Sequence, residues 1–333
     1  MEKEIKVATI IVSYNRSSLL KQSLEAINNQ SRSTDYLIVV DNNSTDDSLE
    51  VASCAKNVTK IVNLKENLGG AGGFTAGIAL ALAEYKPDYV WIMDDDCIPE
   101  KQALEELLKV TDSYDGQVAL VASEAIWHDG TVHPMNKPRP RRFLNAISKM
   151  KAKKIACTQI RTASFVSILI DTRAIYEDGL PIGDFFIWND DFEYTGRILK
   201  NRVGLYAPNS KVKHLTKQLA GSDKDPGERF YYEVRNKLWT YRYSKAFTLF
   251  EKMIYVLVSL RRWFITYKNS CDKSVIYSCL IKGMKDSLKH FDNNSDFFEK
   301  HFTSIKVQNF NCDTAAYEKN LYEWYLNEFH NCE

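Results

Sequence analysis

Paired cysteines and a secretory signal are both missing from this sequence of 333 residues. The seven cysteines form no Cys-x-x-Cys pair and show no regular spacing, so a disulfide framework is not expected. The first six residues contain no apolar stretch of the kind that a signal peptide needs. We therefore expect a cytoplasmic protein whose cysteines are free thiols.

An apolar run long enough to cross a membrane is also missing. The most apolar helical segment, residues 246–267, is interrupted by Glu251, Lys252, Arg261 and Arg262. Such a helix can lie on a membrane surface but cannot span the bilayer. Hydrophobic residues make up 44% of the chain and the net charge is only +1, so the sequence predicts an ordered globular protein.

Strands and helices alternate through the N-terminal part. Apolar runs predict buried strands at 7–12, 36–40, 60–62 and 89–93. Helices are expected at 17–30 and 74–84, with another that starts near Asn43 and Ser44 and has Asp46 and Asp47 in its first turn. This alternation indicates an α/β fold in which helices cover both faces of a mainly parallel sheet.

The carboxyl ends of these four strands carry polar residues or glycines. They are residues 13–15, 41–43, 67–70 and 94–96. Because ligands bind at the carboxyl edge of such a sheet, we expect the four segments to line one site.

Asp94, Asp95 and Asp96 form the most informative of these segments. Three adjacent carboxylates repel one another, and a fold tolerates them where water is plentiful or a divalent cation neutralises them. Mg²⁺ takes one or two carboxylates and completes its shell with water and phosphate oxygens. The triplet indicates a metal and diphosphate site, and a solvated acidic turn at a helix start is the alternative.

Four glycines, Gly69, Gly70, Gly72 and Gly73, precede the helix expected at 74–84. They permit close backbone approach to a ligand and expose helix N-terminal amides to an anion. A dinucleotide-binding loop is a weaker interpretation, because Thr75 stands where the third glycine of that motif belongs. Glycines that only let the helix pack closely on the sheet are the other alternative.

Taken together, these segments resemble the motifs of family 2 glycosyltransferases of the GT-A fold. The resemblance rests on residues 12–16, 40–46, 67–74 and 91–96, in that order. It implies that Asp94 and Asp96 bind a divalent metal ion, Mn²⁺ or Mg²⁺, against the donor diphosphate. It also implies that the nucleotide is bound by Ser13, Asn15, Asp41, Asn67, Gly69, Gly70 and Asp95.

A second block, residues 185–194, resembles the Trp-x-Asp-Asp-x-Glu element of the same family. The resemblance makes Asp191 the catalytic base and places Trp188 and Asp190 beside the donor sugar or the acceptor. Such a base is required, because an acceptor hydroxyl that attacks an anomeric carbon must lose its proton. The alternative is a plain helix start, with Asn189 as its cap and an ion pair between Glu193 and Arg197.

His214 ends the second of two strands expected at 203–208 and 211–214. A histidine at this place completes the metal shell in the family, so the resemblance assigns His214 to the metal. Neutral imidazole suits Mn²⁺ better than Mg²⁺. Without the resemblance, a lone histidine is more often structural.

A basic segment lies between Thr131 and Ile170, where the sequence has no acidic residue. Its cations are Lys137, Arg139, Arg141, Arg142, Lys149, Lys151, Lys153, Lys154 and Arg161. The segment fits a pyrophosphate-linked lipid acceptor or an anionic membrane face, and a solvated loop is the alternative. We do not expect nucleic acid as a partner, because the interleaved aromatic residues of a single-strand platform are missing.

From about residue 225 the pattern becomes helical and aromatic. Residues 229–236 resemble a Tyr-Tyr-x-x-Arg-Asn element of bacterial polysaccharide transferases. We expect a catalytic domain over 1–225 and a helical region over 226–333 that contacts the acceptor, a membrane or another subunit.

The sequence thus predicts an inverting, metal-dependent glycosyltransferase of bacterial surface polysaccharide synthesis, in the cytoplasm or at the inner face of the cell membrane. It uses a nucleotide-sugar donor and a saccharide or lipid-linked saccharide acceptor. The resemblance favours UDP-galactofuranose, with dTDP-rhamnose or a UDP-hexopyranose as alternatives. A nucleotidyltransferase or dinucleotide enzyme and a non-catalytic assembly partner are alternatives of other classes. The oligomeric state is left open.

Overall fold

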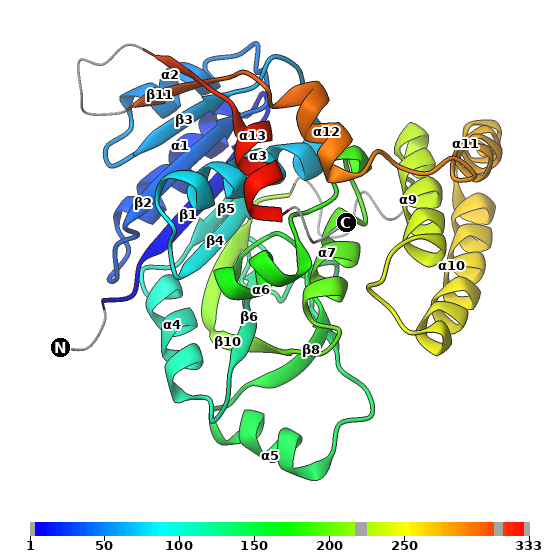
Figure 1. Ribbon diagram of the computed structural model, residues 1–333. Helices are drawn as coiled ribbons and strands as arrows, with labels where there is room; N and C mark the ends of the chain where they lie inside the picture. Colours follow the sequence, from blue (N-terminus) through cyan, green and yellow to red (C-terminus); the bar gives the residue numbers. More distant parts are fainter. Residues whose placement is uncertain (1–3, 217–224, 310–315, 330–333) are drawn as a thin grey trace.

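One mixed sheet, with 12 strands in the described residues, organises the chain (Figure 1). The structure is a computed structural model that describes residues 4–216, 225–309 and 316–329. Strands β3, β2, β1 and β4 lie next to one another in parallel, as the sequence predicts. Their bounds are Val7–Ser13 for β1, Tyr36–Asp41 for β2, Lys60–Asn63 for β3 and Tyr89–Asp94 for β4.

The sheet continues beyond β4 with strands of both directions. Strand β9 is antiparallel to β4 and to β6, while β10 is parallel to β6 and antiparallel to β8. Short β5 pairs with the end of β10, and β7 closes this edge against β8. The bounds are Cys97–Pro99 for β5, Val118–Ile126 for β6, Arg139–Pro140 for β7, Thr158–Thr162 for β8, Ile168–Asp171 for β9 and Val203–His214 for β10.

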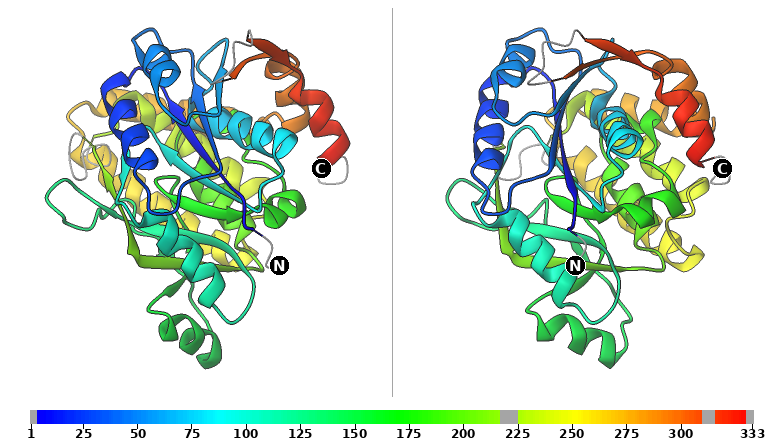
Figure 2. Two further views of the ribbon diagram at one scale, coloured as in Figure 1. Left: turned by 90° about the vertical axis from the view of Figure 1, so that its left-hand side faces the viewer. Right: turned by 60° about the vertical axis from the view of Figure 1, so that its left-hand side comes forward.

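Helices cover both faces of the sheet, which confirms the predicted α/β class (Figure 2). Alternate residues of β1 enter two separate cores. Val7 and Ile11 pack with α1 and α4 on one face, and Ile10 and Val12 pack with α3 on the other. The helices up to β10 are α1 (Ser17–Asn28), α2 (Ser48–Cys54), α3 (Gly69–Glu84), α4 (Ala103–Ser113), α5 (Ala146–Lys154), α6 (Thr172–Asp178) and α7 (Asp190–Ile198).

Helix α3 begins at Gly69, five residues before the start expected from the sequence. Nearly all residues of α3 are buried, and its glycines let the helix backbone pack closely on the sheet. A Cβ atom on Gly73 would lie 2.5 Å from Val12 Cγ1, and one on Gly77 would lie 2.5 Å from Ile10 Cγ2. The packing interpretation therefore applies to these glycines, whereas Gly69 has a φ of +67° and turns the chain into the helix.

Two further boundaries differ from the expectation. Helix α2 starts at Ser48 instead of near Asn43, because Asn43 is left-handed with a φ of 62° and Asp41 accepts a hydrogen bond from the Ser44 amide in a turn. The two strands expected at 203–208 and 211–214 form a single strand, β10, whose register against β6 shifts between Ala207 and Lys211.

The C-terminal part contains two different structures. Helices α9 (Phe230–Arg242), α10 (Leu249–Asn269) and α11 (Lys273–Asp286) pack together at the right of Figure 1. The chain then returns to the sheet, where β11 (Ile305–Asn309) pairs with β3 and β12 (Tyr317–Lys319) pairs with β11. Helices α12 (Asn294–His301) and α13 (Leu321–Phe329) join the core beside α3. Residues 226–333 are therefore not wholly helical, and the division at 225 stays a prediction.

Cys54, Cys97, Cys157, Cys271 and Cys279 are free thiols, and the remaining two, Cys312 and Cys332, lie outside the described residues. Within the described ranges, none of the helices combines the length and the apolar character that crossing a bilayer requires.

The return of the chain to the sheet can be tested at Phe298 of α12, which is fully buried in the core around α3. We expect Phe298→Ala to lower the free energy of unfolding by about 3–5 kcal/mol. The control is Tyr277→Ala on α11, where the side chain is 58% exposed and a change within about 0.5 kcal/mol is expected. Urea denaturation of the whole chain measures both. A separate transition that alone responds to Phe298→Ala would contradict this integration.

Candidate functional site

A cleft of about 850 Å³ opens at the carboxyl edge of β1 and β4. Its walls come from the start of α3, the segment before α7, and helices α9 and α10. Ten of the residues that the sequence singles out line it, namely Asn67, Gly69, Gly70, Asp94, Asp95, Asp96, Trp188, Asp190, Asp191 and His214. The expected convergence on one site is therefore seen for most of them, and their chemical roles stay predictions.

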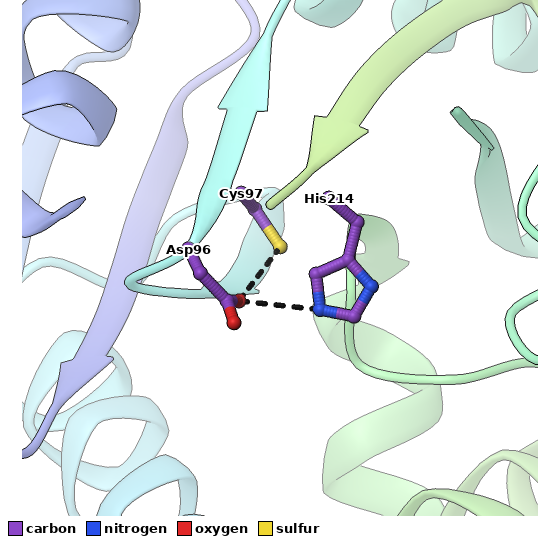
Figure 3. Close-up of side chains that lie close together, drawn as sticks. All are labelled: Asp96, Cys97 and His214. Carbon is purple, nitrogen blue, oxygen red and sulfur yellow. Dashed lines mark hydrogen bonds and ion pairs between the residues drawn. The ribbon is translucent and has the colours of Figure 1, made fainter. Parts of the chain in front are cut away.

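The carboxylate triplet is placed by β4 and β5. Asp94 is the last residue of β4, and Asp95 and Asp96 form the turn into β5. Strand β5 pairs with β10 so that Cys97 lies opposite His214. This pairing brings together two segments more than a hundred residues apart, and His214 Nε2 lies 3.2 Å from Asp96 Oδ1 (Figure 3).

Arg16 offsets part of the negative charge. Its guanidinium lies 2.6 Å from Asp96 Oδ2 and 3.2 Å from Asp95 Oδ1. Burial alone would raise the pKa of Asp96, but the hydrogen bond and charge of His214, together with Arg16, lower it below its usual value. Burial raises the pKa of Asp95 to about 6, and burial with its two neighbours raises the pKa of Asp94 well above its usual range. One arginine thus neutralises the triplet only partly.

The atoms around Asp96 suit a divalent ion. Ligand atoms of Asp96, Cys97 and His214 lie within 4.8 Å of one another, and Asp94 lines the same cleft. His214 Nδ1 lies 2.9 Å from Asn136 Oδ1, which can only accept a hydrogen bond, so Nδ1 carries a proton and the ring is held with Nε2 toward Asp96. The Asp96 carboxylate and, once Nε2 has lost its proton, the imidazole could hold such an ion. Carboxylate and imidazole ligands fit Mn²⁺.

The glycine end of the cleft is shaped by Asn42. Its side chain donates to Gly69 O and accepts from the Leu68 amide, both at 2.8 Å. Asn67 Oδ1 accepts from the Gly69 amide, and a Cβ on Gly70 would lie 3.9 Å from Asp190 Oδ2. The loop is therefore fixed, and it lies beside Asp190.

Ser13, Asn15 and Asp41 are not among the residues that line the cleft. Ser13 Oγ donates to Asp95 Oδ2 at 2.9 Å, and Asn15 Oδ1 accepts from the Thr45 amide at 2.7 Å. Asp41 is 2% exposed, and its Oδ1 is buried without a hydrogen-bond partner in the described structure. An orphaned buried acceptor of this kind suits a ligand that donates hydrogen bonds.

Asp190 and Asp191 begin α7 after a strained loop. Phe186, Trp188 and Asn189 have φ values of 65°, 66° and 65°, a left-handed conformation that such residues rarely adopt. Burial raises the pKa of Asp191 to about 6, and burial together with the charge of Asp191 raises the pKa of Asp190 further. Both shifts leave a carboxylate that accepts a proton more readily than an exposed one.

Helix α9 fixes this loop from behind. The Asn236 amide, fully buried, donates to the carbonyl oxygens of Phe185, Ile187 and Trp188 at 2.7–2.9 Å. Arg235 donates to Asn236 Oδ1, which orients the amide, and also to Phe185 O. The Arg-Asn pair of the Tyr-Tyr-x-x-Arg-Asn element thus positions the backbone that leads to Asp191.

A buried ion pair lies under the same loop. Glu233 accepts from Asn189 at 2.9 Å and from Trp263 at 3.2 Å, and Lys237 Nζ lies 3.0 Å from it. The alternative in which the Asn189 side chain caps α7 is wrong, because that side chain turns toward Glu233 instead. The expected ion pair between Glu193 and Arg197 is present, at 2.8 Å.

Three arginines of the basic segment serve the fold. Arg161 pairs with Glu251 at 2.7 Å, Arg141 donates to carbonyl oxygens before β10, and Arg139 lies over the rings of Phe192 and Tyr255. The segment is therefore not one continuous free anion-binding surface. The lysines of α5 are exposed, with one exception. Lys151 is half-buried and pairs with Asp115.

Five contributors to the site were not selected from the sequence: Arg16, Asn42, Asn136, Glu233 and Asn236. Arg16 and Asn42 fall within the family motifs, so the motifs themselves carried the signal. Asn236 and Glu233 fall within the Tyr-Tyr-x-x-Arg-Asn segment, whose roles the sequence left open. Asn136 had no signal, because only the chain path brings it to His214.

Solved structures share this fold. TarS of S. aureus in complex with UDP-GlcNAc aligns with a TM-score of 0.56 at 17% identity, covering 85% of this chain and 81% of TarS. The mannosyltransferase PcManGT from Pyrobaculum calidifontis, in complex with GDP-Man and Mn²⁺, aligns at 0.53 and 17% identity, covering 85% and 76%. The chain therefore has the GT-A fold.

Residues 8–172 match the family model Glycosyl transferase family 2, so the chain carries a domain of that family and the resemblance of its motifs is confirmed. The chain is 39% identical to galactofuranosyltransferase GlfT1 of Mycolicibacterium smegmatis over 93 residues, and the alignment covers 28% of this chain and 30% of the relative. It is 31% identical to the O-antigen chain rhamnosyltransferase RfbN of Salmonella typhimurium over 104 residues, and that alignment covers 31% of this chain and 32% of the relative. The chain thus spans about a third of the length of these relatives.

The role of Asn236 can be tested through the mobility of the loop. We expect Asn236→Ala to lower the free energy of unfolding by roughly 1–3 kcal/mol, because three buried carbonyl groups lose their donor. Hydrogen exchange of residues 184–190 should accelerate while exchange in β1 and β2 stays unchanged. Asn269→Ala, at an exposed position at the end of α10, is the matched control. Unchanged exchange at 184–190 in the Asn236 variant would contradict the assignment.

Proposed function

We propose that the protein is an inverting, metal-dependent glycosyltransferase. One observation carries the proposal: the cleft brings the start of α7, with Asp191, to the same carboxyl edge as Asp94, Asp96 and His214. A base and a candidate diphosphate site thus face one space that is large enough for a nucleotide sugar and an acceptor group.

Asp94, Asp96 and His214 would bind Mn²⁺ or Mg²⁺. When bound, such an ion supplies positive charge that stabilises the departing nucleoside diphosphate. The imidazole favours Mn²⁺, and Mn²⁺ is present in the mannosyltransferase and GalNAc-T7 structures that share the fold. Asn136 holds the His214 ring with Nε2 toward the site through its hydrogen bond with Nδ1.

Asp191 acts as the catalytic base in this proposal. It takes the proton of the acceptor hydroxyl as the new glycosidic bond forms on the face of the sugar opposite the leaving diphosphate, so the anomeric configuration inverts. A pKa of about 6 suits this task, because the carboxylate is ionised at neutral pH and still accepts a proton better than an exposed aspartate. Trp188 and Asp190 line the space where the transferred sugar would lie.

The nucleotide would lie along β1, β2 and the glycine segment. Asp41 Oδ1 is a buried acceptor without a hydrogen-bond partner, and it could accept a hydrogen bond from the uridine or the ribose. Asn67, Gly69 and Gly70 line the cleft where the diphosphate would lie. Ser13, Asn15 and Asp95 complete the proposed nucleotide set, with Ser13 acting through its hydrogen bond to Asp95.

The donor that we propose is UDP-galactofuranose. Support comes from the relatives, since proteins named galactofuranosyltransferase GlfT1 from two mycobacterial species match at 37–39% identity over part of their length. A rhamnosyltransferase and a β-N-acetylglucosaminyltransferase also match, which keeps dTDP-rhamnose and UDP-hexopyranoses as alternatives.

The acceptor is a saccharide or a lipid-linked saccharide of bacterial surface polysaccharide synthesis, such as O-antigen or capsule. Relatives named for amylovoran biosynthesis and for the O-antigen chain support this class. The reaction would take place in the cytoplasm, with peripheral association at the inner face of the cell membrane.

Our first functional prediction concerns Asp191. Asp191→Asn should lower the turnover number by at least about a hundredfold while leaving metal-dependent donor binding intact. In the parent, kcat should fall as the pH drops below about 6, because protonation of Asp191 removes the base, and the variant should lack this limb. Nucleoside diphosphate release at a series of pH values measures both effects. A variant within severalfold of the parent would transfer the role to Asp190 or Glu193.

The same assay separates the classes of protein. A nucleotidyltransferase would release pyrophosphate, and an inert assembly partner would release nothing.

The donor prediction is tested by competition among UDP-galactofuranose, UDP-galactose, UDP-glucose and dTDP-rhamnose with an acceptor present. We expect the highest kcat/KM for UDP-galactofuranose. Preference for any of the other three would overturn the donor assignment and leave the base and metal assignments standing, since specificity depends on contacts with the sugar hydroxyls.

A further inference from the structure

The α10–α11 hairpin leaves two apolar stripes uncovered. On α10 the stripe recurs every three or four residues, and each side chain is 53–68% exposed: Phe250, Met253, Leu257, Leu260 and Phe264. On α11 and just beyond it the stripe has the same spacing: Tyr277, Ile281, Met284 and Leu288. Exposed apolar surface on this scale usually marks an interaction site.

The opposite side of the hairpin is fixed to α9. Trp263 of α10 and Ile276 of α11 are buried against Phe230 and Val234. A Cβ on Gly283 would lie only 2.9 Å from Val234 Cβ, so α11 packs directly on α9. The stripes therefore face away from α9. Helices α10 and α11 themselves lie at the side of the molecule remote from β2 and β3 (Figure 1).

Positive charge surrounds the stripes. Residues 249–289 contain eight lysines and arginines but three acidic residues, a net charge of +5 in a chain whose total is +1. The acids are engaged: Glu251 pairs with Arg161, Asp286 accepts from the Tyr231 hydroxyl, and Asp272 caps α11. The exposed cations are Arg261, Lys268, Lys273, Lys282, Lys285 and Lys289.

We propose that this α10–α11 face docks on an anionic lipid bilayer. The apolar side chains enter the boundary between headgroups and acyl chains, and the surrounding cations contact the lipid phosphates. None of the described helices is suited to crossing a bilayer, so the hairpin lies on the surface. A second copy of the chain is a poorer occupant, because a symmetric contact would bring two faces of net charge +5 together.

The face also adjoins the cleft. Arg262 of α10 lines the cleft, while Phe264, two residues on, belongs to the exposed stripe. A docked protein would therefore bring the α9 and α10 wall of the cleft close to the lipid surface. Under the proposed function, and resting on it, this placement favours a lipid-linked acceptor over a free saccharide.

Vesicle co-sedimentation of the whole chain tests the docking without donor or acceptor. Vesicles of phosphatidylcholine alone are compared with an equimolar mixture of phosphatidylcholine and phosphatidylglycerol. We expect strong binding to the mixture, weak binding to phosphatidylcholine, and loss of binding as salt increases. The double variant Leu257→Gln and Phe264→Gln should bind the mixed vesicles at least about tenfold more weakly than the parent, because two inserting side chains are lost.

The chain offers a matched control on α5. Ile147 and Met150 are 68% and 70% exposed beside basic residues, against 68% and 67% for Leu257 and Phe264. The double variant Ile147→Gln and Met150→Gln should bind like the parent. Arg261→Gln should weaken binding about fivefold at low salt, with little effect at high salt. Far-UV circular dichroism and nucleoside diphosphate release confirm that each variant is folded.

Three outcomes would overturn the proposal. Equal, salt-independent binding to both vesicle types would leave the cations without a role, and loss of binding in the α5 variant alone would move the surface to α5. A dimer in analytical ultracentrifugation that the α10 variant dissociates, with no vesicle binding by the parent, would identify a second copy as the occupant. Since binding is measured without turnover, failure here leaves the proposed transferase activity standing, and failure of that activity leaves the docking testable.

Discussion

Mutual repulsion among five carboxylates is the constraint around which the site is built. Asp94, Asp95, Asp96, Asp190 and Asp191 share one cleft, and burial raises the pKa of four of them. Only Asp96 has a lowered pKa, because Arg16 and His214 contact it directly. Such an arrangement costs stability, and in the proposed function a divalent cation would supply the positive charge that relieves it.

The supporting structure keeps these groups in place against that repulsion. Phe186 O accepts from the Ala71 amide at 3.0 Å, and a Cβ on Gly69 would lie 2.1 Å from the same oxygen. The glycine segment and the loop before Asp191 therefore contact each other through backbone atoms. Asn236 fixes the other side of that loop. Because the strained residues are held from both sides, the position of Asp191 depends on the glycine segment and on α9.

The sequence was informative where local pattern decides structure. Apolar runs located β1 to β4, and strand ends located Asp94 to Asp96, because a parallel sheet gathers its carboxyl ends on one edge. Local pattern could not show that α3 begins at Gly69, since glycines are poor helix formers and the packing of Gly73 on Val12 and of Gly77 on Ile10 is a tertiary contact. The return of β11 to β3 and the approach of Asn136 to His214 depend on tertiary contacts for the same reason.

Thermal unfolding with and without Mn²⁺ tests the central account most directly, with UDP added in a second series. If the carboxylates bind a cation, Mn²⁺ should raise the midpoint temperature of unfolding above its value in excess chelator. UDP should raise this temperature further only when Mn²⁺ is present. At a hundredfold excess over its Kd, a ligand stabilises the folded state by about 2.7 kcal/mol. Asp96→Ala should abolish both shifts. An unchanged midpoint in the parent, or equal shifts in the parent and in Asp96→Ala, would contradict the account.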